Sequence, residues 1–248
     1  MNDILRPFLV LTLRRTGGTS LVRLMSALSA FPTVQHEPLN PGRLWGDIAT
    51  RFAQTGDHIA LRRDLSEVLR GWPNIKHCFD IADPAVTEAL LDACVARGYR
   101  VMLLLREDDA SRIRSLFLAM ATGAWGSDRA AEVFPKIAAG EIALAPVDLA
   151  QVRRRFFADR AAIAEVERLL AKRRIPHVRL THEAVYARDG DMAQRAADVL
   201  ALLGIDVAPS HPAIRRFAAG TGQKSASVMD YLPNRTDFDA VLAELRAS

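Results

Sequence analysis

The hydrophobic positions of the chain form two kinds of pattern, short continuous runs and longer runs at helical spacing. Residues 8–13 and 100–105 read FLVLTL and RVMLLL, which is typical of strands buried on both faces of a parallel sheet. Shorter strands are predicted at 74–81 and 178–180. Apolar residues three or four apart predict helices between and after these strands, at 21–28, 44–55, 59–70, 84–97, 110–122, 148–174 and 192–203.

This order of segments predicts an α/β fold with a central parallel sheet flanked by helices in three layers. We expect a single domain over residues 1–248, because no repeat or linker divides the chain. Glycine and proline interrupt the pattern around 123–150, where we expect a mostly helical cap over the site. The tail from residue 209 shows little periodicity before 238–245.

Ligands of parallel sheets bind at the carboxyl ends of the strands. The loops that follow the predicted strands should therefore meet at one edge of the sheet. This placement predicts that Arg15, Arg106 and His182 lie in one region.

The first strand runs through Arg14-Arg-Thr-Gly-Gly-Thr-Ser20 into the first helix. Glycines let the backbone curl, and the helix start presents N–H groups and partial positive charge, so such a turn with two arginines beside it favours a bound phosphate or sulfate. The alternative is an ordinary connection capped by a threonine. A triphosphate-binding loop needs lysine after its last glycine, but Thr19 follows Gly18, and the dinucleotide GxGxxG pattern is missing too.

A second candidate anion site follows the strand 100–105. Arg106 stands at its end, and Ser115 comes nine residues later on the next helix. A guanidinium and a hydroxyl from one strand-loop-helix unit are able to grip a phosphate together. The alternative is a solvated arginine and a serine bonded to its own helix backbone.

Composition narrows the choice of partners. The net charge of +4 over 248 residues suits an anionic ligand but is too small to indicate nucleic acid. The two cysteines, Cys78 and Cys94, give neither a disulfide framework nor metal-ligand spacing, so we expect buried thiols. No apolar run reaches the roughly 18 residues of a membrane span, and 8–13 lacks a cleavage site, so we expect a cytoplasmic protein without a transmembrane segment.

Together these motifs resemble those of PAPS-dependent sulfotransferases (PAPS is 3′-phosphoadenosine-5′-phosphosulfate). The turn resembles their 5′-phosphosulfate loop, and the nine-residue Arg–Ser spacing resembles the branch of bacterial Nod-factor and trehalose sulfotransferases. Residues 178–185, with Gly204-Ile205 after the next helix, are similar to the family's YEDL and FLG element. The chain departs from the family at His182, Ala184 and Gly18, where tyrosine, aspartate and a hydroxyl residue are usual.

The resemblance implies a P-loop-like sulfotransferase fold and transfer of a sulfuryl group from PAPS to a hydroxyl of a carbohydrate or glycolipid, without a metal. Arg15 would act in catalysis and, with the following loop, hold the phosphosulfate. Arg106 and Ser115 would hold the 3′-phosphate. The implied nucleotide-binding residues are Arg15, Thr16, Gly17, Gly18, Thr19, Ser20, Arg106, Ser115, His182 and Lys224.

The reaction also needs a base near the acceptor hydroxyl. We expect Glu37 in this role, because the bacterial carbohydrate enzymes of the family carry a glutamate at the corresponding place. His36 is the alternative base, since imidazole titrates near neutral pH. A short extended piece would carry both side chains outward, and Glu37 as a plain surface carboxylate is the third alternative.

Two further residues are candidates for the acceptor side. Lys76 is a charge inside an apolar strand, where it either faces the sulfate or reaches solvent at the strand end. Trp45 either stacks on a sugar ring or belongs to the core. Two other functions stay open, a P-loop-type nucleotide kinase or hydrolase and a nucleotide-binding module without catalysis.

Overall fold

The computed structural model describes residues 6–34, 36–187, 190–220 and 225–247. The chain forms two compact units. The sheet unit comprises Met1–Glu107 and Ala162–Ala219, and the helical unit comprises Asp108–Ala161 and Gly220–Ser248. That the two units act as one domain stays a prediction.

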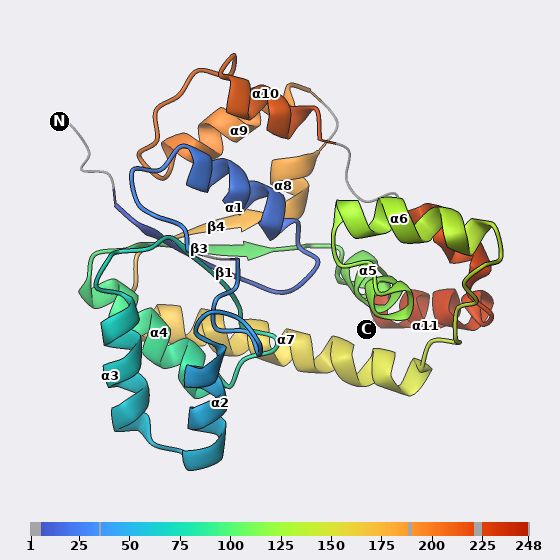
Figure 1. Cartoon of the computed structure of the whole chain (residues 1–248), viewed down its shortest axis with the longest axis horizontal. Coiled ribbons are helices and arrows are strands. Elements are labelled where there is room, and N and C mark those ends of the chain that lie inside the picture. The colour runs from blue at the N-terminus through green and yellow to red at the C-terminus, as the bar shows by residue number, and fades with distance from the viewer. Residues whose placement is uncertain (1–5, 35, 188–189, 221–224, 248) are drawn as a thin grey trace. The chain divides into compact units, whose positions relative to one another are not determined.

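The sheet unit is built on four parallel strands, β1 (Phe8–Thr12), β2 (Ile75–Cys78), β3 (Arg100–Leu105) and β4 (His177–Thr181). Their order across the sheet is β2-β1-β3-β4, so the first strand lies in the interior (Figure 1). Leu9 of β1 is opposite Ile75 on one side and Val101 on the other. The predicted α/β fold with a central parallel sheet is thereby confirmed.

Side chains of β1 alternate between two cores because successive residues of a strand point to opposite faces. Leu9 and Leu11 belong to one apolar cluster, and Phe8 and Val10 to the other. The first cluster is completed by α2 (Gly46–Thr55), α3 (His58–Val68), α4 (Pro84–Ala96) and the last turns of α7 (Leu149–Lys172). The second is completed by α1 (Gly18–Ala27), α8 (His182–Tyr186), α9 (Met192–Ala201) and α10 (Pro212–Ala218), on the opposite face in Figure 1.

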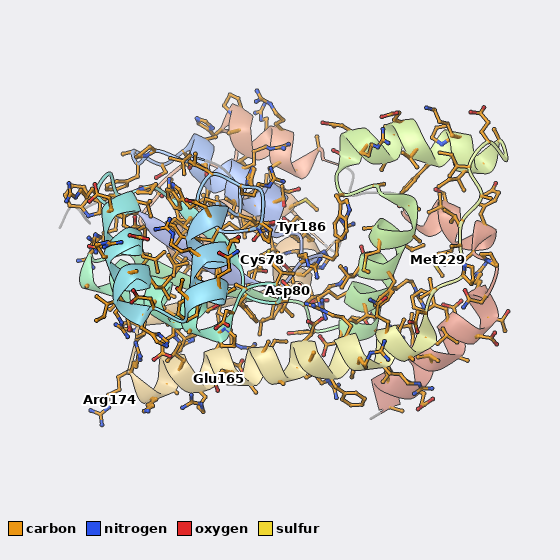
Figure 2. The ribbon with its side chains drawn as sticks, turned by 60° about the horizontal axis from the view of Figure 1, so that its bottom comes forward. Cys78, Asp80, Glu165, Arg174, Tyr186 and Met229 are labelled. Atoms are coloured by element: carbon orange, nitrogen blue, oxygen red, sulfur yellow. The ribbon has the colours of Figure 1, made fainter. Side chains whose placement is uncertain are left out.

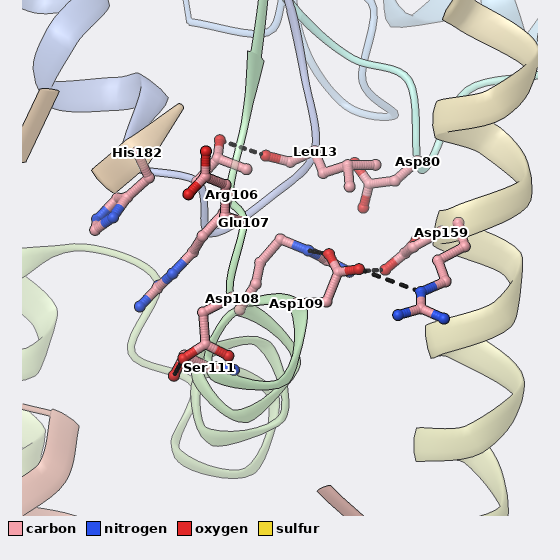
Figure 3. A network of polar contacts seen from close by, with 12 residues as sticks. Leu13, Asp80, Arg106, Glu107, Asp108, Asp109, Ser111, Asp159 and His182 are labelled. Atoms are coloured by element: carbon pink, nitrogen blue, oxygen red, sulfur yellow. Dashed lines mark hydrogen bonds and ion pairs between the residues drawn. The ribbon is translucent and has the colours of Figure 1, made fainter. Parts of the chain in front are cut away.

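The helical unit has its own apolar core, formed by α5 (Asp109–Thr122), α6 (Ser127–Ala138), the first turns of α7, the 3-10 helix η1 (Ser225–Tyr231) and α11 (Arg235–Ala247). A buried ion pair joins Arg112 of α5 to Asp159 of α7, and Arg155 also contacts that carboxylate at 2.6 Å (Figure 3). Within the region around 123–150, predicted to be mostly helical, α6 covers Ser127–Ala138 and α7 begins at Leu149. That it covers the site stays a prediction.

Local signals set several helix ends. Asp83 accepts a hydrogen bond from the Ala85 N–H at the start of α4, and Pro84 takes the first helical position, as the sequence indicates. The tail differs from expectation, because α10 lies where little periodicity is visible. This helix has seven residues, too few to show a clear period, and Ile214 anchors it in the core of the sheet unit.

No helix in the described part of the chain combines the length and apolar character needed to cross a membrane.

The buried His77 of β2 predicts a specific loss of stability in acid. Burial lowers its pKa to about 4, below the 6.5 of an ordinary histidine, and its Nε2 lies 2.9 Å from the Thr87 hydroxyl. Between those two pH values only the unfolded chain takes up the proton, so the free energy of unfolding should fall by roughly 3 kcal/mol as pH drops from 7 to 4.

Urea unfolding of His77→Gln at a series of pH values should show a shallower decline than the wild type. Thr87→Val keeps the imidazole and should keep the wild-type slope. Equal slopes in wild type and His77→Gln would show that this histidine is not the group responsible.

Candidate functional site

The backbone between β1 and α1 curls through two left-handed residues. Arg15 has φ of 69° and Gly17 has φ of 81°, and α1 begins at Gly18. The N-cap residue is Gly17, which has no side chain that could bond the first N–H groups of the helix. The first N–H groups of α1 therefore face outward together with the positive end of the helix dipole, which is the geometry of an anion-binding turn.

The hydroxyl residues of the turn have different surroundings. Thr16 is buried and donates to the Leu13 carbonyl oxygen at 2.9 Å, so its side chain stabilises the turn and only its backbone is left for a ligand. Thr19 and Ser20 are exposed in the first turn of α1. The predicted turn thus offers mainly backbone donors.

Arg14 differs from expectation, since its side chain is directed to the loop after β2 and not to the turn. Its Nε lies 2.8 Å from Oδ2 of Asp80, and its backbone N–H donates to Oδ1 at 3.1 Å. The Asp80 side chain is fully buried. We conclude that this ion pair holds the ends of β1 and β2 together and leaves Arg15 as the cation of the turn.

Lys76 crosses the first turn of α1 from the neighbouring strand. It is 4% exposed, and its Nζ donates to the Thr19 hydroxyl at 3.1 Å. A Cβ atom added to Gly18 would lie 3.0 Å from Cε of Lys76. Gly18 therefore makes room for the lysine, which explains why a larger residue would be disfavoured here.

Glu37 does not point outward as predicted. It forms an ion pair with Lys76 and accepts a hydrogen bond from the Asn40 side chain at 2.6 Å, with 19% of its side chain exposed. Burial alone would raise the pKa of Glu37, but the charge of Lys76 and hydrogen bonds from Lys76, Cys78 and Asn40 outweigh it and lower the pKa. The prediction that Glu37 points outward is therefore wrong, and its backbone is left-handed with φ of 53°; the expected extended piece itself includes Gln35, which lies outside the described residues.

His36, the alternative base, is half-buried beside the same lysine. Burial first, and then the charges of Lys76, Arg23 and Arg43, lower its pKa below the ordinary value, while Glu37 opposes the shift. Its buried Nδ1 has no hydrogen-bond partner among the residues that the structure describes. At neutral pH the imidazole is thus uncharged and able to accept a proton.

Arg15, Arg106 and His182 lie in one region, as the order of the strands predicts. Burial and then the charge of Arg106 lower the pKa of Arg15, and the same two causes lower that of His182. Glu183 partly balances this charge, because its carboxylate lies 3.8 Å from Nε of Arg106 and accepts from the Glu107 N–H at 2.9 Å. Figure 3 shows Arg106 and His182 at the end of β3 and β4.

Tyr186 is a site residue that the sequence does not reveal. Its hydroxyl donates to the Gly17 carbonyl oxygen at 2.6 Å, and its ring stacks near that of His182 with centroids 4.8 Å apart. The only sequence signal is its place four residues after His182, which puts both on one side of a helix.

Three predicted residues remain, namely Ser115, Lys224 and Trp45. Ser115 lies on α5 in the helical unit, so its pairing with Arg106 stays a prediction, and Lys224 lies outside the described residues. Trp45 is 8% exposed and belongs to the core cluster under the sheet. That burial fits the core alternative better than sugar stacking, which stays untested.

The described residues contain no cluster of three or more histidine, cysteine, aspartate or glutamate side chains suited to a metal ion. The site gathers cations instead. The positive end of α1 is surrounded by Lys76, Arg15 and Arg106. Each positive charge at this end of a helix raises the free energy of the folded protein by about 0.3–1 kcal/mol. An anionic ligand at the turn would relieve this repulsion.

Replacing Lys76 tests whether its ion pair lowers the pKa of Glu37. In Lys76→Met, burial of Glu37 is no longer opposed by the lysine charge, so the pKa of Glu37 should rise above its ordinary value of about 4.3. Carbon-detected NMR titration of the glutamate side chains measures it. Thr19→Val removes a partner of Lys76 but keeps both charges, and should leave the Glu37 pKa low. An unchanged pKa in Lys76→Met would contradict the assigned cause.

No protein-family model matches the chain, and no curated protein matches its sequence. Among solved structures, the chain is similar to a sulfotransferase from Alicyclobacillus acidocaldarius, with 18% sequence identity and a TM-score of 0.40. This likeness covers 98% of the present chain and 96% of the other. A likeness of this strength does not by itself establish an activity.

Proposed function

We propose that this protein transfers a sulfuryl group from PAPS to a hydroxyl group of a carbohydrate or glycolipid. The observation that carries the proposal is the gathering of Lys76, Arg15 and Arg106 around the start of α1, whose N-cap residue is a glycine. That arrangement favours a ligand with more than one negative charge. The order of the turn, with arginine before the glycines, supports a phosphosulfate over a magnesium-bound triphosphate.

PAPS fits the donors of this site. The backbone N–H groups from Thr16 to Ser20 and the Arg15 guanidinium would hold the phosphosulfate, and Arg106 with Ser115 would hold the 3′-phosphate. When bound, PAPS supplies a sulfuryl group on an anhydride bond whose cleavage releases adenosine 3′,5′-bisphosphate. Lys76 and Arg15 stabilise the negative charge that develops at the turn as that bond breaks.

Glu37 would take the proton from the acceptor hydroxyl as its oxygen bonds to sulfur. The ion pair with Lys76 keeps the carboxylate ionised, and therefore ready to accept a proton, at neutral pH. The same ion pair lowers its basicity. A ligand anion that attracts Lys76 would weaken this pair and make Glu37 a stronger base.

The compartment in this proposal is the cytoplasm. Cys78 and Cys94 are both free and buried. Unpaired thiols are usual in a reducing compartment.

Binding measurements separate this function from that of a nucleotide kinase or hydrolase. Isothermal titration calorimetry should show tighter binding of adenosine 3′,5′-bisphosphate than of 5′-AMP or of ATP with magnesium, because the 3′-phosphate meets Arg106. Arg106→Ala should reduce the preference of the bisphosphate over 5′-AMP by tenfold or more. Tighter binding of ATP with magnesium, and indifference to the 3′-phosphate, would contradict the proposal.

Turnover separates an enzyme from a non-catalytic binding module. After a screen of sugars, glycolipids and small alcohols with labelled PAPS, Glu37→Gln should lower the transfer rate at least roughly 100-fold, the scale of general-base catalysis. Its affinity for the bisphosphate should not fall, because the change leaves Lys76 without an opposing carboxylate.

His36→Gln is the matched variant for this experiment, since it removes the neighbouring base and keeps the Glu37–Lys76 ion pair. A large loss in His36→Gln with little change in Glu37→Gln would move the role of base to His36. No transfer by the wild-type protein to any acceptor would favour the binding module.

A further inference from the structure

The hydrogen bond between Tyr186 and Gly17 joins two parts of the chain that are 169 residues apart. Tyr186 ends the short helix α8, and its ring is mostly buried between His182 and Phe217, with centroid distances of 4.8 and 5.6 Å (Figure 2). Its hydroxyl donates to the carbonyl oxygen of Gly17, the residue before the first turn of α1. The tyrosine therefore acts on the backbone of the turn itself.

The peptide group that links Gly17 to Gly18 is planar and trans, so its C=O and N–H bonds point in opposite directions. The carbonyl oxygen is directed to the Tyr186 hydroxyl. The N–H of Gly18 consequently points the other way, out of the helix start, where the first N–H groups of α1 converge. Holding the carbonyl fixes the direction of this donor.

Such a restraint matters at this position. Gly17 and Gly18 both lack a Cβ atom that would restrict the peptide group between them. The carbonyl of Gly17, as the N-cap residue, accepts the first intrahelical hydrogen bond, and the Tyr186 hydroxyl adds a second restraint to it. Gly17 is the N-cap residue of α1 and has no side chain that could cap the helix. The two rings also leave no room for a side chain at position 17, since a Cβ atom there would lie 2.6 Å from the Tyr186 ring and 3.0 Å from the His182 ring.

We propose that Tyr186 is a positioning residue for the anion site: by binding the Gly17 carbonyl oxygen, it aims the Gly18 N–H at a phosphate or sulfate bound in the turn. The hydroxyl of Tyr186 does not itself touch the anion. The identity of that anion as part of PAPS rests on the proposed function, but the aiming of the N–H does not.

Tyr186→Phe tests the inference, because it keeps the ring and removes only the hydroxyl. Loss of one hydrogen bond that orders a donor should weaken binding of inorganic pyrophosphate, 5′-AMP and adenosine 3′,5′-bisphosphate by a common factor of about fivefold. The ratio of the last two affinities should stay unchanged, since the 3′-phosphate lies elsewhere. In 15N–1H NMR spectra, pyrophosphate should move the Gly18 amide resonance strongly in the wild type and less in the variant.

Tyr99→Phe is the matched control. Tyr99 also donates from a buried hydroxyl to a backbone carbonyl oxygen, that of Pro73 at 2.9 Å, but it precedes β3 and so lies at the opposite edge of the sheet from the turn. This variant should lower thermal stability to a similar extent and leave all three affinities unchanged. The comparison separates positioning of the turn from a general loss of stability.

Equal affinities in wild type and Tyr186→Phe would overturn the inference, as would a Gly18 amide resonance that pyrophosphate leaves in place in the wild type. The second observation needs no variant and holds even if Tyr186→Phe folds poorly. A wild-type protein that binds pyrophosphate with the expected Tyr186 dependence, but does not prefer the bisphosphate, would support the inference and contradict the proposed function. A wild type that binds none of the three ligands would overturn both.

Discussion

Three cationic side chains lie near the start of α1, where the helix dipole is itself positive. The rest of the site is arranged around the repulsion between these positive charges. Lys76 reaches the first turn from β2, Arg15 lies in the turn, and Arg106 follows β3. Arg15 and Arg106 come together because they follow the ends of β1 and β3 at one edge of the sheet, whereas Lys76 reaches the helix from within β2. Glu37 neutralises part of this charge, and Arg14 is directed away to Asp80. Glu183 balances part of the charge of Arg106, and a bound anion would neutralise the remainder.

The ion pair of Glu37 with Lys76 links ligand binding to base strength. Without a ligand, the lysine holds the carboxylate ionised but weakly basic. In the proposed function, an anion at the turn would compete for the same ammonium group, so the carboxylate would become more basic when the site is filled. His36, uncharged beside the same lysine, shares this electrostatic environment.

Much of the fold follows from local sequence signals, whereas the site depends on distant contacts. The continuous apolar run of β3 is found at the predicted residues, and Asp83 with Pro84 starts α4 as expected, because these signals act over a few residues. The inward turn at Glu37 depends on a left-handed backbone that no sequence pattern marks. The decisive side-chain pairs are separated by 39, 66 and 169 residues, namely Lys76–Glu37, Arg14–Asp80 and Tyr186–Gly17. Sequence patterns place such residues at an edge of the sheet but do not choose their partners.

The dependence of the melting temperature on pyrophosphate concentration, at constant ionic strength, tests the central claim most directly. If the cations around α1 form an anion site, the melting temperature should rise with the logarithm of pyrophosphate concentration once that exceeds the dissociation constant. Lys76→Met and Arg15→Gln should each reduce the rise. A melting temperature that responds to pyrophosphate no more than to chloride of equal ionic strength would contradict the account.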